Sequence, residues 1–324
     1  MDADEIELLT ATMLGLADTA PVGELTASLD EFGWRDVLAA HPMEAIAALF
    51  AAQGRTGRWS SALQDVLASD VERLGINGDA NVVLPRPNAS MSGAFRDGEV
   101  TVQGVLLEPR DDRGTIVTVG RSDNGERLVI AIEHDDLRVE RREGLDPALG
   151  VRDVSGTTRR FTVLAEAGAA GEWWEFAQAR SRLALCHQMV AALFVMVEQA
   201  RGHVTERAQF GRLVGTFQAV RHKLVDAHVA STAAECSTAT AWETDDLPLA
   251  AATAKVVTGQ AVSVTAANVQ QLLAGVGFTA EHPFHHFMKR TLVLERMLGS
   301  AAELAPQVGR QLVERGKAPR LVQL

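Results

Sequence analysis

Residues Arg207–Leu224 read RAQFGRLVGTFQAVRHKL and place an arginine, an aromatic residue and a glycine close together in a segment whose apolar residues have helical spacing. Such an arginine can be an exposed side chain at a helix kink, with the aromatic ring packed in the core. It can also grip a diphosphate, because the guanidinium is a planar fork of donors that keeps its charge, while Phe210 covers an adenine or a ribose. The stretch alone leaves both interpretations open.

A second stretch, QLLAGVGFTAEHP at Gln271–Pro283, follows a long helical segment. Gly275 and Gly277 can end that helix in left-handed geometry, and Pro283 can begin the next one. That interpretation explains the glycines but leaves Gln271 unexplained. A functional interpretation covers both, because glycines let the backbone approach a bulky cofactor and the Gln271 amide supplies hydrogen bonds.

The surrounding sequence predicts an α+β multidomain protein. Residues 1–76 read as a short N-terminal helical domain rich in Ala, Leu and Met. Residues 77–170 hold short Val-, Ile- and Thr-rich runs separated by turn signals, which are typical of antiparallel strands in a small β-barrel or sandwich. Residues 171–324 predict a C-terminal four-helix bundle that carries both motif stretches.

Each of the four bundle helices is expected from an apolar face with spacings of three and four residues. The first starts near Glu172, the second runs from Leu213 through Phe217 to Ala227, the third spans about Leu247 to Leu273, and the fourth begins near Pro283.

Composition and charge narrow the function classes. The 31 Lys and Arg residues against 42 Asp and Glu residues give a net charge of -11, and no long basic run is present, so a nucleic-acid partner is not expected. The acidic N-terminus and the absence of about 18 uninterrupted apolar residues predict a cytoplasmic protein without a membrane span. Cys186 and Cys236 lie far apart with no metal-ligand spacing, so no metal site is expected.

Taken together, in this order and on this architecture, the two stretches resemble the acyl-CoA dehydrogenase family of flavoproteins. The family pattern R-x-x-F-G, with a Gln seven positions after the Gly, is met by Arg207, Phe210, Gly211 and Gln218. Its later pattern Q-x-x-G-G-x-G-[FY] is met by Gln271, Gly275, Gly277 and Phe278, with Ala274 in place of the first Gly. The resemblance covers the architecture of the whole chain and is specific in residues only beyond about Glu172.

In that family FAD lies at a subunit interface and is housed mainly by the neighbouring subunit. The resemblance therefore implies that a group of side chains and backbone positions holds the diphosphate and adenosine end of an FAD. These positions are Arg207, Gln209, Phe210, Phe217, Gln271 and Gly275.

The positions of the family's catalytic glutamate differ here. They fall on Gly299 and Ser181, and neither a glycine nor an unactivated serine can act as a general base. Glu295 is a candidate for a displaced base, although it can equally be a solvated helix charge beside Arg296.

Several residues at the start of the bundle are candidates for a substrate pocket. Arg182, with Arg180, is the candidate patch for the anionic CoA, and Arg182 is the predicted substrate-binding residue. His187 and the pair Trp173-Trp174 can face the acyl pocket, or can belong to the core or to an interface.

The β region shows a second departure, because only Leu84 to Pro87 faintly matches the family's L-T-E-P segment and no tryptophan occurs between residues 80 and 172. The chain thus retains the groups that it would lend to a neighbour's flavin and lacks those that cradle its own. In this asymmetry the chain resembles the glutamate-lacking subunit of the actinobacterial heterotetrameric acyl-CoA dehydrogenases that act in steroid side-chain degradation.

The resemblance implies an FAD-dependent oxidoreductase acting on an acyl-CoA thioester in lipid or steroid catabolism. It further implies a homologous glutamate-bearing subunit as partner in an α2β2 assembly, and electron-transfer flavoprotein as electron acceptor. Two alternatives stay open: a self-sufficient dehydrogenase that uses Glu295 as its base, and a flavin-free scaffold or binding protein of the same fold.

Overall fold

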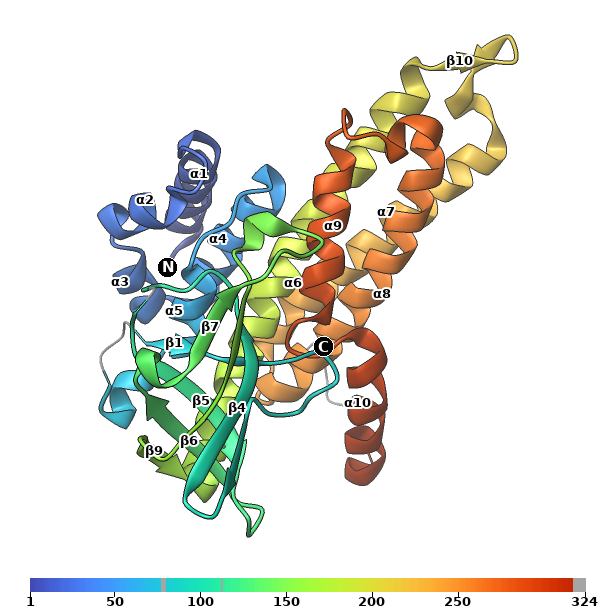
Figure 1. Ribbon diagram of the computed structural model, residues 1–324. Helices are drawn as coiled ribbons and strands as arrows, with labels where there is room; N and C mark the ends of the chain where they lie inside the picture. Colours follow the sequence, from blue (N-terminus) through green and yellow to red (C-terminus); the bar gives the residue numbers. More distant parts are fainter. Residues whose placement is uncertain (77–79, 112, 317–324) are drawn as a thin grey trace.

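The computed structural model describes residues 1–76, 80–111 and 113–316, which form a helical region, a β-sheet and a long helical bundle in that order (Figure 1). The predicted boundary between residues 76 and 77 adjoins residues outside this description, as does the predicted end of the bundle at residues 317–324.

The N-terminal helices pack against the start of the bundle. The capping box of Asp2 and Glu5 begins the first helix, left-handed Gly33 separates the second from the third, and Pro42 is the first residue of the fourth. The fourth helix lies along the first bundle helix so closely that a Cβ on Gly54 would come within 2.2 Å of the Gln188 carbonyl oxygen. The elements are α1 Ala3–Thr19, α2 Leu25–Phe32, α3 Trp34–Ala40, α4 Pro42–Thr56, α5 Ala62–Ala68 and η1 Val71–Leu74.

The strands between residues 81 and 166 form one sheet with the order β7-β8-β4-β3-β5-β6-β9, in which β1 also pairs with β5 and β2 with β4. The predicted antiparallel arrangement holds except at two pairings, because β1 and β3 both run parallel to β5. One face buries a core of Val, Ile, Leu and Phe side chains. The elements are β1 Asn81–Val82, β2 Leu84–Pro85, β3 Gly93–Arg96, β4 Glu99–Leu106, β5 Ile116–Arg121, β6 Arg127–Ile132, η2 His134–Asp136, β7 Arg138–Arg141, η3 Pro147–Leu149, β8 Arg152–Thr158 and β9 Thr162–Glu166.

The C-terminal region is a bundle of α6, α7, α8 and α9, with α10 packed on α8 beside the sheet (Figure 1). Small side chains let α7 and α8 approach closely. The hydroxyl groups of Ser231 on α7 and Thr265 on α8 both donate to the same carbonyl, that of Ala227 on α7. The elements are α6 Ala167–Glu206, β10 Ala208–Gln209, β11 Arg212–Leu213, η4 Val214–Thr216, α7 Gln218–Thr240, η5 Ala241–Glu243, α8 Leu247–Leu273, η6 Ala274–Phe278, α9 Phe284–Arg296 and α10 Ala301–Arg315.

Two helix boundaries differ from the prediction. Helix α6 begins at Ala167, five residues before the expected start. The second helix begins at Gln218 instead of Leu213, because Phe210 and Gly211 adopt positive φ angles of 54° and 77° and fold the preceding residues into the β10–β11 hairpin. The prediction that the second bundle helix starts at Leu213 is therefore wrong, and so is the helical interpretation of the spacing before it.

Two helical segments, α6 and Leu247–Phe278, are long and apolar enough to cross a membrane by length and composition alone. Their most apolar windows are 72% and 56% buried within the fold. Packing inside the bundle accounts for this apolar character.

Candidate functional site

The β10–β11 hairpin carries the first motif at the end of the bundle far from the sheet (Figure 1). The Arg207 backbone anchors it: its N–H donates to the His203 carbonyl at 3.0 Å, and its carbonyl accepts from the Val214 N–H at 2.8 Å. The Arg207 and Gln209 side chains are exposed. The Phe210 ring is 91% exposed and makes only an edge contact with the partly buried Phe217, at a centroid distance of 6.3 Å. The aromatic ring is therefore not a core residue.

The second motif forms the turn between α8 and α9. Gln271 is exposed on the last turn of α8, and Ala274 ends that helix with a positive φ of 51°. A Cβ added at Gly275 would have no atom within 4 Å, so the backbone there is open to a close approach. Gly277 has a structural role instead, because its Cβ would come within 2.9 Å of the Leu273 Cβ.

The two motifs share one end of the bundle (Figure 1). His203 on α6 lies close to both: burial lowers its pKa, and the nearby charges of Arg207 in the first motif and His282 in the second lower it further. Exposed donors, an exposed ring and an open glycine backbone are thus presented outward together. They fit the diphosphate and adenosine end of a dinucleotide, which needs charge-assisted donors and a flat apolar surface.

Arg182, the remaining predicted site residue, lies far from this end. It is on α6 some 25 residues before Arg207, or roughly 37 Å at about 1.5 Å per residue. Its Nε donates to the Leu298 carbonyl at 2.9 Å, and burial lowers its pKa to about 10. Arg180 faces a different side of α6, where it pairs with Asp70 at 3.3 Å, so the two arginines do not form one patch.

Arg182 lines a cavity of about 220 Å³, here called the arginine cavity, between the sheet, α6 and the α9–α10 turn. Gly299 also lines it, so the arginine cavity occupies the place where the family's base is expected. Its arginines are Arg86, Arg121, Arg127, Arg182 and Arg296.

The two expected base positions are structural. Gly299 has a φ of 98°, and a Cβ there would come within 2.8 Å of the Leu304 side chain. Ser181 is fully buried, and its hydroxyl has no hydrogen-bond partner among the described residues. Neither residue offers a group that takes a proton from a substrate.

Glu295 is engaged in holding the α9–α10 turn. Its Oε1 accepts from the Ala301 N–H at 2.7 Å and its Oε2 lies 3.4 Å from Arg296 Nε, while the side chain is only 13% exposed. The buried Lys255 supports the same turn, because its Nζ donates to the carbonyls of Glu295 and Gly299 at 2.7 and 3.1 Å. Burial lowers the pKa of Lys255 to about 8. Lys255 was not predicted as a structural residue, although it is the only charged residue in Leu247–Leu273.

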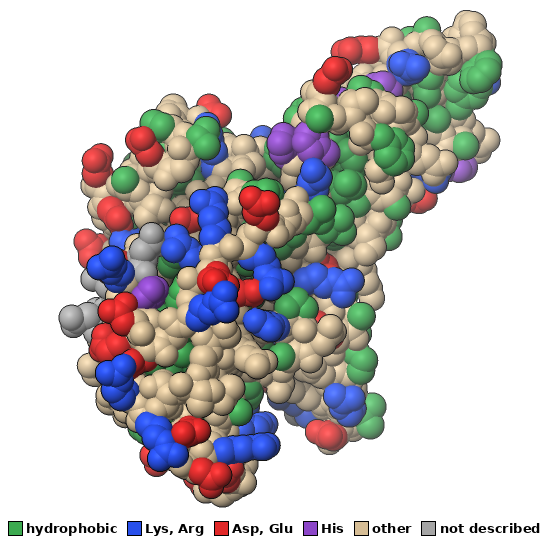
Figure 2. Space-filling view, in the orientation of Figure 1, with side chains coloured by type: hydrophobic (Ala, Val, Ile, Leu, Met, Phe, Trp, Pro, Cys, Tyr) green, Lys and Arg blue, Asp and Glu red, His purple; other side chains and the backbone are tan. Residues whose placement is uncertain are grey.

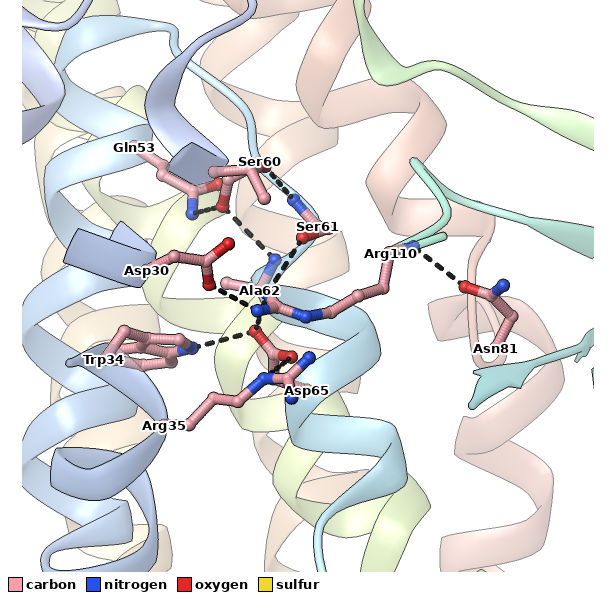
Figure 3. A network of polar contacts seen from close by, with 11 residues as sticks. Asp30, Trp34, Arg35, Gln53, Ser60, Ser61, Ala62, Asp65, Asn81 and Arg110 are labelled. Atoms are coloured by element: carbon pink, nitrogen blue, oxygen red, sulfur yellow. Dashed lines mark hydrogen bonds and ion pairs between the residues drawn. The ribbon is translucent and has the colours of Figure 1, made fainter. Parts of the chain in front are cut away.

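A larger cavity of about 720 Å³ lies between α3, α5, η1 and α6, and Trp173 and Phe176 line it. Beside it, Asp65 accepts from Trp34 Nε1 at 3.1 Å, from Arg35 Nε at 3.2 Å and from Arg110 Nη1 at 3.2 Å (Figure 3). Arg110 also pairs with Asp30, so this network ties α2, α3 and α5 to the segment after β4. This network could not be predicted from the sequence, because the partners in each of these hydrogen bonds are 30 or more residues apart.

The remaining candidates for the acyl pocket, Trp173, Trp174 and His187, lie in three different places. Trp174 lines the arginine cavity and Trp173 the larger one, so each helps to separate the two cavities. His187 belongs to the interior, where its Nε2 accepts from Trp242 Nε1 at 3.1 Å. Burial lowers the pKa of His187 to about 4.

Comparison with known proteins gives consistent results. Residues 175–313 match the family described as "Acyl-CoA dehydrogenase, C-terminal domain". The chain is 27% identical over 265 residues to acyl-CoA dehydrogenase IpdE2 of Mycobacterium tuberculosis, a match that covers 70% of this chain and 81% of that protein.

Two solved structures share the fold over nearly the whole chain. The ChsE4-ChsE5 complex from Mycobacterium tuberculosis matches with a TM-score of 0.74 and 19% identity, covering 97% of this chain and 98% of that one. A variant of the Tcur3481-Tcur3483 steroid ACAD matches with a TM-score of 0.77 and 18% identity, covering 97% and 99%.

Proposed function

We propose that this chain is the non-catalytic subunit of a heteromeric, FAD-dependent acyl-CoA dehydrogenase, because residues 175–313 match the acyl-CoA dehydrogenase C-terminal domain and the whole chain has the fold of solved acyl-CoA dehydrogenases. The observation that carries the proposal is the outward presentation of both motifs at one end of the bundle, while Gly299 and Ser181 occupy the expected base positions. The partner is a homologous subunit that bears the catalytic glutamate.

In this proposal the chain binds and orients the partner's cofactor. FAD supplies the hydride acceptor for the α,β-dehydrogenation of an acyl-CoA thioester. The Arg207 guanidinium binds the diphosphate, the Phe210 ring covers the adenosine, and the Gln271 amide hydrogen-bonds at the place where the open backbone of Gly275 lets the cofactor come close. Gln209 and Phe217 shape the same surface of the hairpin.

The assembly and the substrate class in this proposal rest on two structural neighbours. One is described as a complex of two proteins, ChsE4 and ChsE5, and the other, Tcur3481-Tcur3483, as a steroid ACAD. By analogy we propose an α2β2 assembly and a steroid-derived acyl-CoA for this chain. Electron-transfer flavoprotein is the acceptor in this proposal.

Replacing Arg207 by alanine tests the proposal. The chain is produced with a cognate glutamate-bearing subunit, and the FAD retained after gel filtration is measured by its visible absorbance. Loss of a charge-assisted contact of about 1.5 to 3 kcal/mol should weaken FAD binding roughly 10- to 100-fold. Arg201→Ala is the matched control, since Arg201 is exposed on α6 and pairs only with Glu198 among the described residues.

Two outcomes would contradict the proposal. Yellow, active homomers of this chain alone would show that it carries a complete site. A complex with the partner that holds no FAD would favour the flavin-free scaffold.

A further inference from the structure

Helix α7 is an outer helix of the bundle: it packs on α6 and α8, and its opposite face is exposed. This face carries an apolar stripe, in which Val225 and Val229 are 56% and 58% exposed. The stripe is here called the α7 seam, and its members recur at spacings of three and four residues: His222, Val225, Val229, Thr232 and Cys236. That spacing is the heptad pattern by which one helix packs along another.

The α7 seam and the neighbouring helix α8 are poor in charge. Between Val225 and Thr240 only Asp226 and Glu235 carry a charge, and in α8 only Lys255 does, which is fully buried. The most apolar stretch of α8 and the turn after it is only 56% buried. Figure 2 shows that charged side chains are dense over the sheet and sparser along the arm of the bundle that extends to the hairpin. An exposed apolar surface with few charges is typical of a surface that another protein covers.

The charges beside the α7 seam favour a second copy of this chain as the covering protein. Arg221, His228 and Glu235 follow one another at intervals of seven residues, so they lie along the same flank of the seam. Arg221 and Glu235 are roughly 21 Å apart along the helix, at about 1.5 Å per residue, and cannot pair within one chain. When a second copy of α7 runs antiparallel to the first, the same flanks meet, and Arg221 of each copy lies opposite Glu235 of the other.

We propose that the α7 seam binds the α7 seam of a second copy of this chain, antiparallel, about a two-fold axis near Val229. His222 and Cys236 lie seven residues on either side of Val229, so the seam is self-complementary along its length. The contact covers the exposed valines and forms two Arg221–Glu235 pairs per dimer. It is separate from the contact with the glutamate-bearing subunit, which uses the hairpin and the α8–α9 turn, and it does not depend on the proposed function.

Analytical ultracentrifugation of the full chain, without FAD or another subunit, tests for this dimer. We expect a reversible dimer of twice the chain mass of 34.7 kDa. Val229→Glu places two carboxylates beside each other at the axis and should weaken dimerisation by about tenfold or more. Val163→Glu is the matched control, because Val163 is 41% exposed on β9 in the sheet, and it should leave the dimer unchanged.

Exchanging the two flanking charges tests the antiparallel arrangement. Arg221→Glu and Glu235→Arg each place like charges opposite one another twice per dimer, and each should weaken dimerisation about tenfold. The double variant restores opposite charges and should bring the dissociation constant back to within about threefold of the wild type. Because these two residues cannot reach each other within one chain, only a contact between copies gives this rescue.

Oxidative cross-linking with diamide locates the axis. Val229→Cys should form a covalent dimer, because the two copies of residue 229 lie close to the axis. The wild type should form none: Cys236 is exposed on the same seam, but an antiparallel contact holds its two copies roughly 21 Å apart. A disulfide needs Cα atoms within about 7 Å of each other.

Several results would overturn the inference. They are a chain that stays monomeric at its highest soluble concentration, a dimer that Val229→Glu leaves unchanged, and no rescue in the double charge variant. A covalent wild-type dimer through Cys236 would also overturn it, because that bond requires a parallel contact. All of these measurements use the isolated chain and none bears on FAD retention by the complex, so this inference and the proposed function can fail separately.

Discussion

At the scale of single residues, burial decides which titratable groups are structural. His187 and Lys255 both lie inside the bundle, and burial lowers the pKa of each. His187 is held neutral as an acceptor for the Trp242 indole, and Lys255 donates to two carbonyls of the α9–α10 turn. Both side chains can carry a charge inside the fold. For His187 this makes the free energy of unfolding depend on pH, which can be measured.

Acidification should destabilise the protein through His187. Its pKa is about 4 in the folded chain against the ordinary histidine value of 6.5, so between these values the unfolded chain binds a proton that the folded chain does not. Stability therefore falls as the pH falls from 6.5 to 4, by up to roughly 3 kcal/mol from this residue. Urea unfolding at several pH values measures this slope.

The variant His187→Gln keeps an acceptor for Trp242 and removes the titrating group. Its unfolding free energy should depend less on pH than that of the wild type between pH 4 and 6.5. An identical slope in the two proteins would show that other groups cause the acid destabilisation.

Glu295→Gln separates the displaced-base alternative from our proposal. The amide oxygen can still accept from the Ala301 N–H, so we expect unchanged turnover in the assembled complex and a loss of stability of about 0.5 to 1 kcal/mol. A self-sufficient enzyme with Glu295 as base would instead lose its turnover. Steady-state assays and thermal unfolding of the same preparations distinguish the two.

At the scale of elements, the structure of the α9–α10 turn explains why a glutamate cannot simply be introduced at residue 299, the position of the family's catalytic base. Four groups hold it: the Lys255 ammonium, the Glu295 carboxylate, the capping box of Ser300 and Glu303, and the left-handed Gly299 against Leu304. A side chain at residue 299 would need both an unfavourable backbone conformation and the space that Leu304 fills.

Gly299→Ala should therefore destabilise the chain by about 1 to 3 kcal/mol. Gly309→Ala is a matched control in the adjoining helix, because Gly309 is an exposed residue inside α10 whose added Cβ would meet no atom within 4 Å. The control should stabilise the chain by up to about 1 kcal/mol, since alanine is the better helix former. Chemical denaturation of both variants measures the difference, and equal effects would refute the role given to Gly299.

Elements set by local periodicity could be predicted, and those set by special backbone angles could not. Helix α8 has the predicted bounds because its small apolar residues repeat at helical spacing from Leu247 to Leu273. The hairpin at residues 208–213 was missed because Phe210, a residue without a preference for positive φ, adopts 54° there. The two motifs could be located from the sequence, but the arginine cavity and the Asp65 network combine residues from distant segments and needed the tertiary structure.

At the scale of the whole molecule, the two sequence motifs and the cavities lie at different ends of the bundle. The exposed hairpin and the α8–α9 turn carry Phe210, 91% exposed, and Phe278, 74% exposed. Exposed aromatic rings of this kind are typical of surfaces that bind a partner.

Hydrogen–deuterium exchange tests this arrangement. The amides of residues 207–217 and 271–278 should exchange more slowly in the FAD-loaded complex than in the isolated chain, because the cofactor and the partner cover them. The amides of the β5–β6 hairpin, residues 116–132, serve as an internal control and should change less. Equal exchange at the hairpin end in both states would place the partner elsewhere.

Helix α6 gives the molecule one further property. It extends unbroken for 40 residues, or about 60 Å at 1.5 Å per residue, from the sheet to the hairpin. Because of this length, a tilt of α6 by one degree at the sheet end would shift the hairpin end of the helix by roughly 1 Å, which is enough to break a bidentate hydrogen bond. We therefore expect substitutions that tilt α6 near Trp174 to shift the hairpin that carries Arg207, although they lie at the other end of the helix.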